Sequence, residues 1–169
     1  MKKIIATLAL LAATTAPAFA AGGWADVSHT DDMSDDKVSI ATIMADNPSG
    51  KFMDHQITRF FVRCKDGNLE TIGATNGYVG ISGYWDVKIT YRVGDAKARS
   101  IIPSTSTDGQ AYFITGKAQK QFLKDMLSGE RLRVTAYDYQ GSGSFSEFTS
   151  VDFRKDLVEN VIKACKVKL

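Results

Sequence analysis

The feature that most constrains this chain is a series of short segments in which apolar and polar residues alternate. The clearest examples are 37–44, 85–91 and 131–137. The segment 56–64 is rich in β-branched and aromatic residues, and residues typical of turns separate all four segments. Alternation with a period of two is typical of a strand with one buried face, and short, closely spaced strands favour an antiparallel sheet. Because helices do not alternate regularly with these segments, a parallel sheet is not expected.

Two segments have a helical period instead. Apolar residues fall at helical spacing over 118–127, where Gly129 ends the segment, and again over 157–162. No linker or internal repeat divides the rest of the chain. We therefore predict a mainly β single domain over residues 21–169, an antiparallel β-sandwich or barrel-like fold with one inserted helix and a C-terminal helix.

The first twenty residues have the pattern of a secretory signal peptide. Lys2 and Lys3 precede an apolar stretch over 4–13, and Ala-Phe-Ala at 18–20 matches a signal-peptide cleavage site. A transmembrane anchor is the alternative, but this apolar stretch is too short to cross the hydrocarbon core of a bilayer. We predict export to the periplasm, cleavage after Ala20 and a mature chain without a membrane span.

The charge balance argues against a nucleic-acid partner. The chain has 21 Lys and Arg against 19 Asp and Glu, and loss of Lys2 and Lys3 with the signal peptide would make the two numbers equal. Domains that bind nucleic acid usually carry a marked excess of basic residues. A hydrophobic content of 44% is typical of a folded protein.

The chain has two cysteines, Cys64 and Cys165. Two cysteines in an exported protein usually pair, and we predict a disulfide between them. A reactive thiol is the alternative, although neither cysteine belongs to a C-x-x-C motif or has a histidine nearby in the sequence. A bridge closing a loop of about 100 residues would contribute about 4–5 kcal/mol to stability.

Few residues are suited to catalysis or metal binding. His29 and His55 are the available bases for a nucleophilic triad, and no G-x-S-x-G motif accompanies them. Two distant histidines are too few for zinc once the cysteines are paired. The run Asp31, Asp32, Asp35 and Asp36 offers oxygen ligands for calcium but lacks the EF-hand pattern, and a solvated loop is the commoner meaning of such a run. We expect no catalytic residues, cofactor or metal, and leave calcium at this loop open.

Aromatic residues in and beside a glycine-rich segment are the candidate binding residues. Residues 76–83 contain three glycines, and Asp108 belongs to a separate Ser-, Thr- and Gly-rich loop. Aromatic side chains beside flexible loops are common at interaction sites. Aromatic side chains are also common in the cores of β-sandwiches, so a structural role is the alternative to a binding role. The candidates are Tyr78, Tyr84, Trp85 and Asp108.

Several short motifs occur in a particular order along the chain. They are Arg63 to Glu70, Ile89 to Arg92, the loop 104–109, the helix 116–129 with Phe122 and Leu127, Arg131 to Val134, and Ala164-Cys165. Trp24 and the acidic run 31–37 precede them. In this order the chain resembles the VasI/TagO-type family of type VI secretion accessory proteins. The resemblance implies an exported, mostly β, non-enzymatic accessory protein, and it supplies no catalytic residues.

Three functions follow from these observations. The first is a periplasmic accessory or binding protein that acts through a protein partner in the cell envelope, with the resemblance implying a link to type VI secretion. The second is a periplasmic inhibitor of a lysozyme or protease, with the loop of Tyr78 or Asp108 entering the enzyme's cleft. The third is a hydrolase that uses two carboxylates, which spacing alone cannot test. We favour the first because the sequence has no recognisable catalytic constellation.

Overall fold

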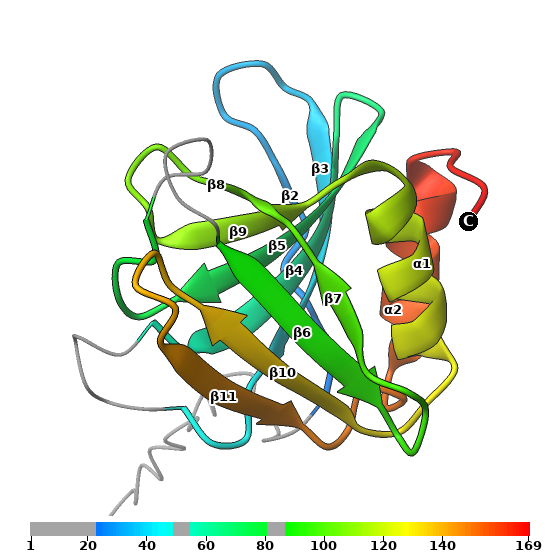
Figure 1. Ribbon diagram of the computed structural model, residues 1–169. Helices are drawn as coiled ribbons and strands as arrows, with labels where there is room; N and C mark the ends of the chain where they lie inside the picture. Colours follow the sequence, from blue (N-terminus) through cyan, green and yellow to red (C-terminus); the bar gives the residue numbers. More distant parts are fainter. Residues whose placement is uncertain (1–22, 49–54, 81–86) are drawn as a thin grey trace, which may run out of the picture.

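The computed structural model describes residues 23–48, 55–80 and 87–169, and Figure 1 shows their arrangement. The predicted signal peptide, Tyr84 and Trp85 lie outside these residues. The described residues form eleven strands and two helices. All the strand pairs are antiparallel, which confirms the predicted mainly β fold class.

The larger sheet has seven strands. Six of them follow the order β1-β3-β4-β5-β9-β8, while β2 pairs with β3. The strands are β1 (Ala25–Asp26), β2 (His29–Thr30), β3 (Lys37–Met44), β4 (Ile57–Lys65), β5 (Asn68–Thr75), β8 (Ser104–Thr105) and β9 (Ala111–Ile114). From Phe60 onward, buried positions of β4 alternate with half-buried ones, as expected for a strand with one face on the core.

The smaller sheet has the strand order β11-β10-β6-β7. Its strands are β6 (Lys88–Val93), β7 (Arg99–Ile101), β10 (Leu132–Tyr137) and β11 (Gly143–Phe148). Ile89, Tyr91 and Val93 of β6 face the core, while Arg92 lies on the outer face. This alternation determines which side chains can meet the helices and which remain outside.

The edges of the two sheets approach each other on both sides. Only Ile102 and Pro103 separate β7 from β8, so one short segment passes from one sheet to the other. On the opposite side the backbone N–H of Asp46 donates to the Glu147 carbonyl oxygen at 2.8 Å, and the Asn47 side chain accepts from the Glu147 N–H at 2.9 Å. These bonds occupy the N–H and carbonyl groups of Glu147 on the edge of β11, which would otherwise be exposed for pairing with another strand.

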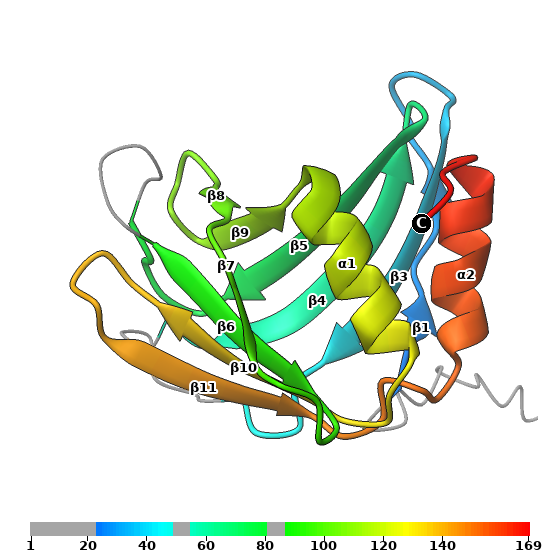
Figure 2. The same cartoon turned by 45° about the vertical axis from the view of Figure 1, so that its right-hand side comes forward.

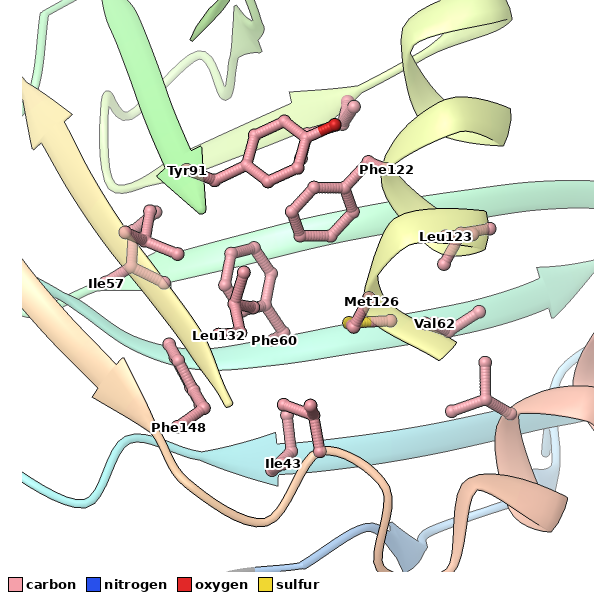
Figure 3. Close-up of a cluster of buried hydrophobic side chains, with 14 of the residues drawn as sticks. Ile43, Ile57, Phe60, Val62, Tyr91, Phe122, Leu123, Met126, Leu132 and Phe148 are labelled. Atoms are coloured by element: carbon pink, nitrogen blue, oxygen red, sulfur yellow. The ribbon is translucent and has the colours of Figure 1, made fainter. Parts of the chain in front are cut away.

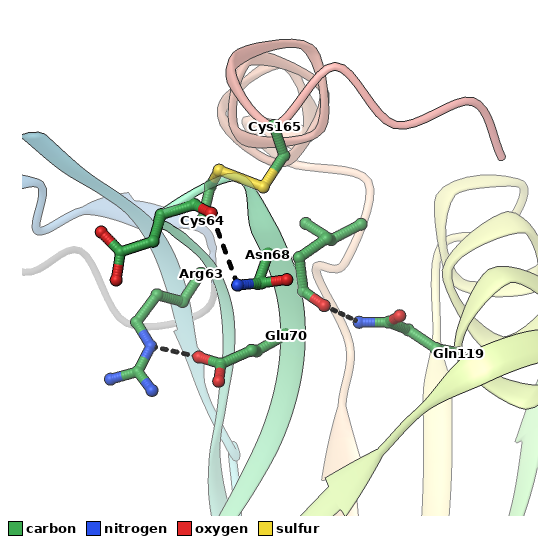
Figure 4. The surroundings of a disulfide bond; sticks show 8 residues. Arg63, Cys64, Asn68, Glu70, Gln119 and Cys165 are labelled. Atoms are coloured by element: carbon green, nitrogen blue, oxygen red, sulfur yellow. Dashed lines mark hydrogen bonds and ion pairs between the residues drawn. A yellow bond between two sulfur atoms is a disulfide. The ribbon is translucent and has the colours of Figure 1, made fainter.

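The two helices fill the open end between the sheets. Helix α1 (Gly116–Leu127) lies between the sheets, and α2 (Lys155–Ala164) packs against β3 and β4 (Figure 2). The buried residues of α1, Gln119, Phe122, Leu123 and Met126, recur at helical spacing on one face. Gln119 donates to the Leu69 carbonyl oxygen at 2.8 Å, which ties α1 to β5 (Figure 4).

Aromatic side chains from both sheets meet α1 in the core (Figure 3). The ring of Phe122 lies 5.4 Å from Phe60 of β4 and 4.9 Å from Tyr91 of β6, measured between centroids. Phe148 of β11 lies 5.2 Å from Phe60. Tilted and edge-to-face pairs of this kind contribute about 0.5–1.5 kcal/mol each beyond the burial of their area. Phe122 therefore links the two sheets through the helix.

The predicted disulfide between Cys64 and Cys165 is confirmed (Figure 4). It joins the end of β4 to the residue directly after α2, with the two Cα atoms 5.4 Å apart and 101 positions apart in the chain. The bridge fixes the C-terminal helix against the larger sheet. A disulfide in a small β-rich domain is typical of an oxidising, exported environment.

Two details differ from the sequence prediction. From the sequence we expect a strand over 144–153, but β11 ends at Phe148. Beyond Phe148 the chain turns, and the Trp24 indole N–H donates to the Val151 carbonyl oxygen at 2.8 Å. The sequence predicts a loop over 104–109, but its first two residues form strand β8. Pairing with β9 holds these two residues in an extended conformation. In the described ranges, none of the helices combines the length and apolar character needed to cross a membrane.

Removal of the disulfide tests its structural role. We expect the variant with Cys64→Ala and Cys165→Ala to lose about 4–5 kcal/mol in free energy of unfolding, because the loop it opens has about 100 residues. Urea unfolding followed by circular dichroism measures this loss. A loss below about 1 kcal/mol would show that the bridge does not constrain the unfolded chain as argued.

Removal of the central aromatic ring tests the link between the sheets. We expect Phe122→Ala to lower the free energy of unfolding by about 3–5 kcal/mol, because it removes a fully buried ring and leaves a cavity. The matched control is Phe145→Ala, since Phe145 is 47% exposed on β11. Equal losses in the two variants, measured by urea unfolding, would contradict the central role of Phe122.

Candidate binding surface

The turn between β10 and β11 is organised by the carboxylate of Asp138. Its Oδ1 accepts the backbone N–H of Gln140 at 2.9 Å and that of Ser142 at 2.8 Å. The Asp138 N–H in turn donates to the Ser142 carbonyl oxygen at 3.0 Å. An aspartate that binds backbone N–H groups shortly after itself is a typical turn former. The turn is therefore held in one conformation.

His55 lies beneath this turn and is almost completely buried, as is Asp138. Its Nδ1 is 3.6 Å from Asp138 Oδ2, and its Nε2 is 2.8 Å from the Ser142 carbonyl oxygen. In a nucleophilic triad, Nε2 accepts the proton of a hydroxyl or thiol. Here a backbone carbonyl occupies that position, so the contacts of His55 serve to hold the turn.

Tyr78 and Tyr139 form the exposed part of this end of the molecule. Their rings meet edge to face with centroids 5.9 Å apart, and they are 49% and 36% exposed. The Tyr139 N–H donates to the Val79 carbonyl oxygen at 3.1 Å, and the Val79 N–H donates to the Gly109 carbonyl oxygen at 2.8 Å. The segment 76–80 therefore lies between the β10–β11 turn and the β8–β9 turn.

The β8–β9 turn carries Asp108. The Ser106 hydroxyl and the Gln110 N–H donate to the Asp108 carboxylate, and these bonds lower its pKa below the usual value. Gly109 follows with φ +66°, and a Cβ at that position would lie 2.3 Å from the Tyr78 ring. Glycine is required there both by the backbone conformation and by the close approach of Tyr78.

We call Tyr78, Tyr139 and the turns 106–110 and 138–142 the tyrosine surface. Both turns lie at the same end of the molecule, on the left in Figure 1. Of the residues predicted to bind, the structure brings Tyr78 and the Asp108 turn together, while Tyr84 and Trp85 lie outside the described residues. Sequence reasoning missed Tyr139, whose one signal is an aromatic residue in a turn between two strands. A binding role for these residues stays a prediction.

The acidic N-terminal loop is organised by hydrogen bonds of Asp31. Its carboxylate accepts from the Met33 N–H at 3.0 Å and from the Lys65 ammonium at 3.1 Å, and both contacts lower its pKa. In the part of the chain that the structure describes, no three His, Cys, Asp or Glu side chains gather in a way that would hold a metal ion.

Comparisons with known proteins find similarity in structure and none in sequence. Neither a protein-family model nor a curated protein sequence matches the chain. Among solved structures, invasion associated protein B from Bartonella henselae is similar, with a TM-score of 0.49 and 12% sequence identity. The similarity covers 88% of this chain and 97% of that protein. Similarity at this level is no guide to a shared activity.

Two substitutions at Asp138 test whether it holds the turn. Asp138→Ala removes the acceptor of two backbone N–H groups, so we expect a loss of about 1–3 kcal/mol in stability and faster hydrogen exchange of the Gln140 and Ser142 amides. Asp138→Asn keeps one side-chain oxygen, and we expect it to retain most of the protection. Unchanged hydrogen exchange of these amides in the alanine variant, measured by NMR, would show that Asp138 does not hold the turn.

Proposed function

We propose that this chain is an exported accessory protein that acts in the cell envelope by binding a protein partner through the tyrosine surface. The observation that carries the proposal is the pair Tyr78 and Tyr139, which are exposed and in mutual contact. Asp138 and His55 hold the turn that carries Tyr139. Tyrosine is enriched among the residues that dominate binding energy at protein interfaces. A ring already held in place loses little conformational entropy when a partner binds.

Compartment and family resemblance support the envelope as the place of action. The Cys64–Cys165 disulfide fits an oxidising environment, and residues 1–20 have the pattern of a signal peptide. The resemblance to VasI/TagO-type proteins extends the proposal to a partner in a type VI secretion system. Under this proposal the protein acts by binding and carries out no catalysis, in keeping with the structural contacts of His55.

A second candidate, a periplasmic inhibitor of a lysozyme or protease, is favoured by the β8–β9 turn. Asp108 is exposed at the tip of this turn, and its carboxylate bonds hold Ser106 and Gln110 in place. An exposed loop that is rigid before binding suits insertion into an enzyme cleft, because little ordering is needed on association. The same surface would then contact an enzyme instead of an assembly component.

Truncation of both tyrosines tests the proposal. We expect the variant Tyr78→Ala, Tyr139→Ala to lose at least tenfold in affinity for the partner, because two interface tyrosines commonly contribute more than 1 kcal/mol each. The oxidised protein from residue 21 onward is immobilised and exposed to an envelope extract from its own source, with Phe145→Ala as the control for an exposed ring elsewhere.

The outcomes of the capture experiment separate the candidates. A stoichiometric partner that is retained by Phe145→Ala and lost by the double variant would support the tyrosine surface, and a secretion-system component would support the family link. If that partner is an enzyme whose rate falls on binding, the inhibitor function replaces the accessory function. Equal capture by all variants would overturn the role of the tyrosine surface.

A further inference from the structure

A cavity of about 580 Å³ lies at the end of the smaller sheet opposite the tyrosine surface. The β6–β7 turn and the start of β7 form one wall, with Lys97 and Arg99, and the C-terminal end of α1 forms the other, with Asp125 and Ser128. Figure 2 shows β7 and α1 side by side around this region. The volume is in the range of small-ligand sites.

The carboxylate of Asp125 accepts two hydrogen bonds and forms an ion pair. Its Oδ2 accepts from the Tyr91 hydroxyl at 2.8 Å and lies 3.0 Å from Arg99 Nε, while its Oδ1 accepts from the Gln121 amide at 2.7 Å. Burial and the Asp125 carboxylate raise the pKa of Tyr91, so its hydroxyl stays a donor. Asp125 therefore fixes the position of the Arg99 guanidinium.

The outer edge of that guanidinium is available to a ligand. Arg99 is 56% exposed and lines the cavity, and among the described residues its two terminal nitrogens have no acceptor. Lys97 lines the same wall and, across the described ranges, forms no ion pair. A guanidinium presents parallel N–H groups in a planar fork, which match the two oxygens of a carboxylate.

The charges around the cavity favour an anion with a single charge. Lys97 and Arg99 are balanced by Asp95 and Asp125 in the lining. Asp95 is fully exposed and pairs with Arg92 at 3.4 Å, and Arg92 lies on the outer face of β6. Asp95 belongs to the lining, so its charge opposes a dianion such as phosphate more strongly than a monoanion.

We propose that this cavity binds a carboxylate group, whose oxygens accept hydrogen bonds from the terminal nitrogens of Arg99 and from Lys97. The carboxylate belongs either to a small organic acid or to the C-terminus of a peptide. The site is distinct from the tyrosine surface, so its occupation does not depend on the proposed partner.

NMR of the arginine side chains in the full mature protein tests this proposal. Acetate, tetra-alanine with a free C-terminus, the same peptide as its C-terminal amide, and inorganic phosphate are titrated separately at constant ionic strength. We expect a saturable shift of the Arg99 Nε–H signal with acetate or the free peptide and none with the amide. Tighter binding of the free peptide than of acetate would identify a chain terminus, and equal binding would identify a small acid.

Variants establish which groups bind. We expect Arg99→Gln to weaken carboxylate binding at least tenfold and Lys97→Gln at least threefold. The affinities are measured from the shifts of backbone amide signals around the cavity. Arg63→Gln is the matched control, because Arg63 also pairs with a carboxylate, that of Glu70, but lies on β4 and does not line the cavity. No saturable shift with either carboxylate, tighter binding of phosphate, or unchanged affinity in both Arg99→Gln and Lys97→Gln would overturn the proposal.

Discussion

The packing of Phe122 between the two sheets is the interaction on which the rest of the structure depends. Each sheet is hydrophobic on one face and must bury that face against another element. The sheets meet at their edges but leave one end open, and α1 enters that opening. Phe122 contacts Phe60 of the larger sheet and Tyr91 of the smaller one, so a single ring completes a core shared by both.

At each end of the smaller sheet, an aspartate carboxylate positions a neighbouring exposed group. At one end Asp138 accepts two backbone N–H groups and thereby fixes the turn that carries Tyr139. At the other end Asp125 accepts from Tyr91 and Gln121 and forms an ion pair with Arg99. In each case the carboxylate accepts two hydrogen bonds and lies against a cationic or imidazole side chain, and its effect is to hold a neighbouring group that remains exposed.

The sequence predicts those features that depend on local pattern. The bounds of β3 at 37–44 agree with the alternating segment, and the helical period locates α1 to within two residues at its start. The pairing of Cys64 with Cys165 follows from compartment and number, without knowledge of the fold. Each of these inferences uses only neighbouring residues or a simple count.

The candidate sites depend on contacts that local pattern does not contain. His55 meets Asp138 across 83 positions, and Arg99 meets Asp125 only because β7 pairs with β6 beside α1. Such pairs are determined by strand register, and a shift of one residue would turn these side chains to the other face. Of the tyrosine surface, the sequence indicated Tyr78 and Asp108 but not the turn of Tyr139 that lies against them.

The separation of the two ends has a consequence for how the protein can work. Lys88 of β6 pairs with Tyr137 next to the β10–β11 turn, whereas Val93 pairs with Leu132 near the cavity. Five residue steps along an antiparallel strand span roughly 17 Å, so a small ligand in the cavity cannot touch the tyrosine surface. Strands β6 and β10, which run between the two ends, are each paired on both sides, and Tyr91 of β6 packs on Phe122. A carboxylate and a protein partner can therefore be bound at the same time, and the carboxylate could belong to a third molecule without competing for the tyrosines.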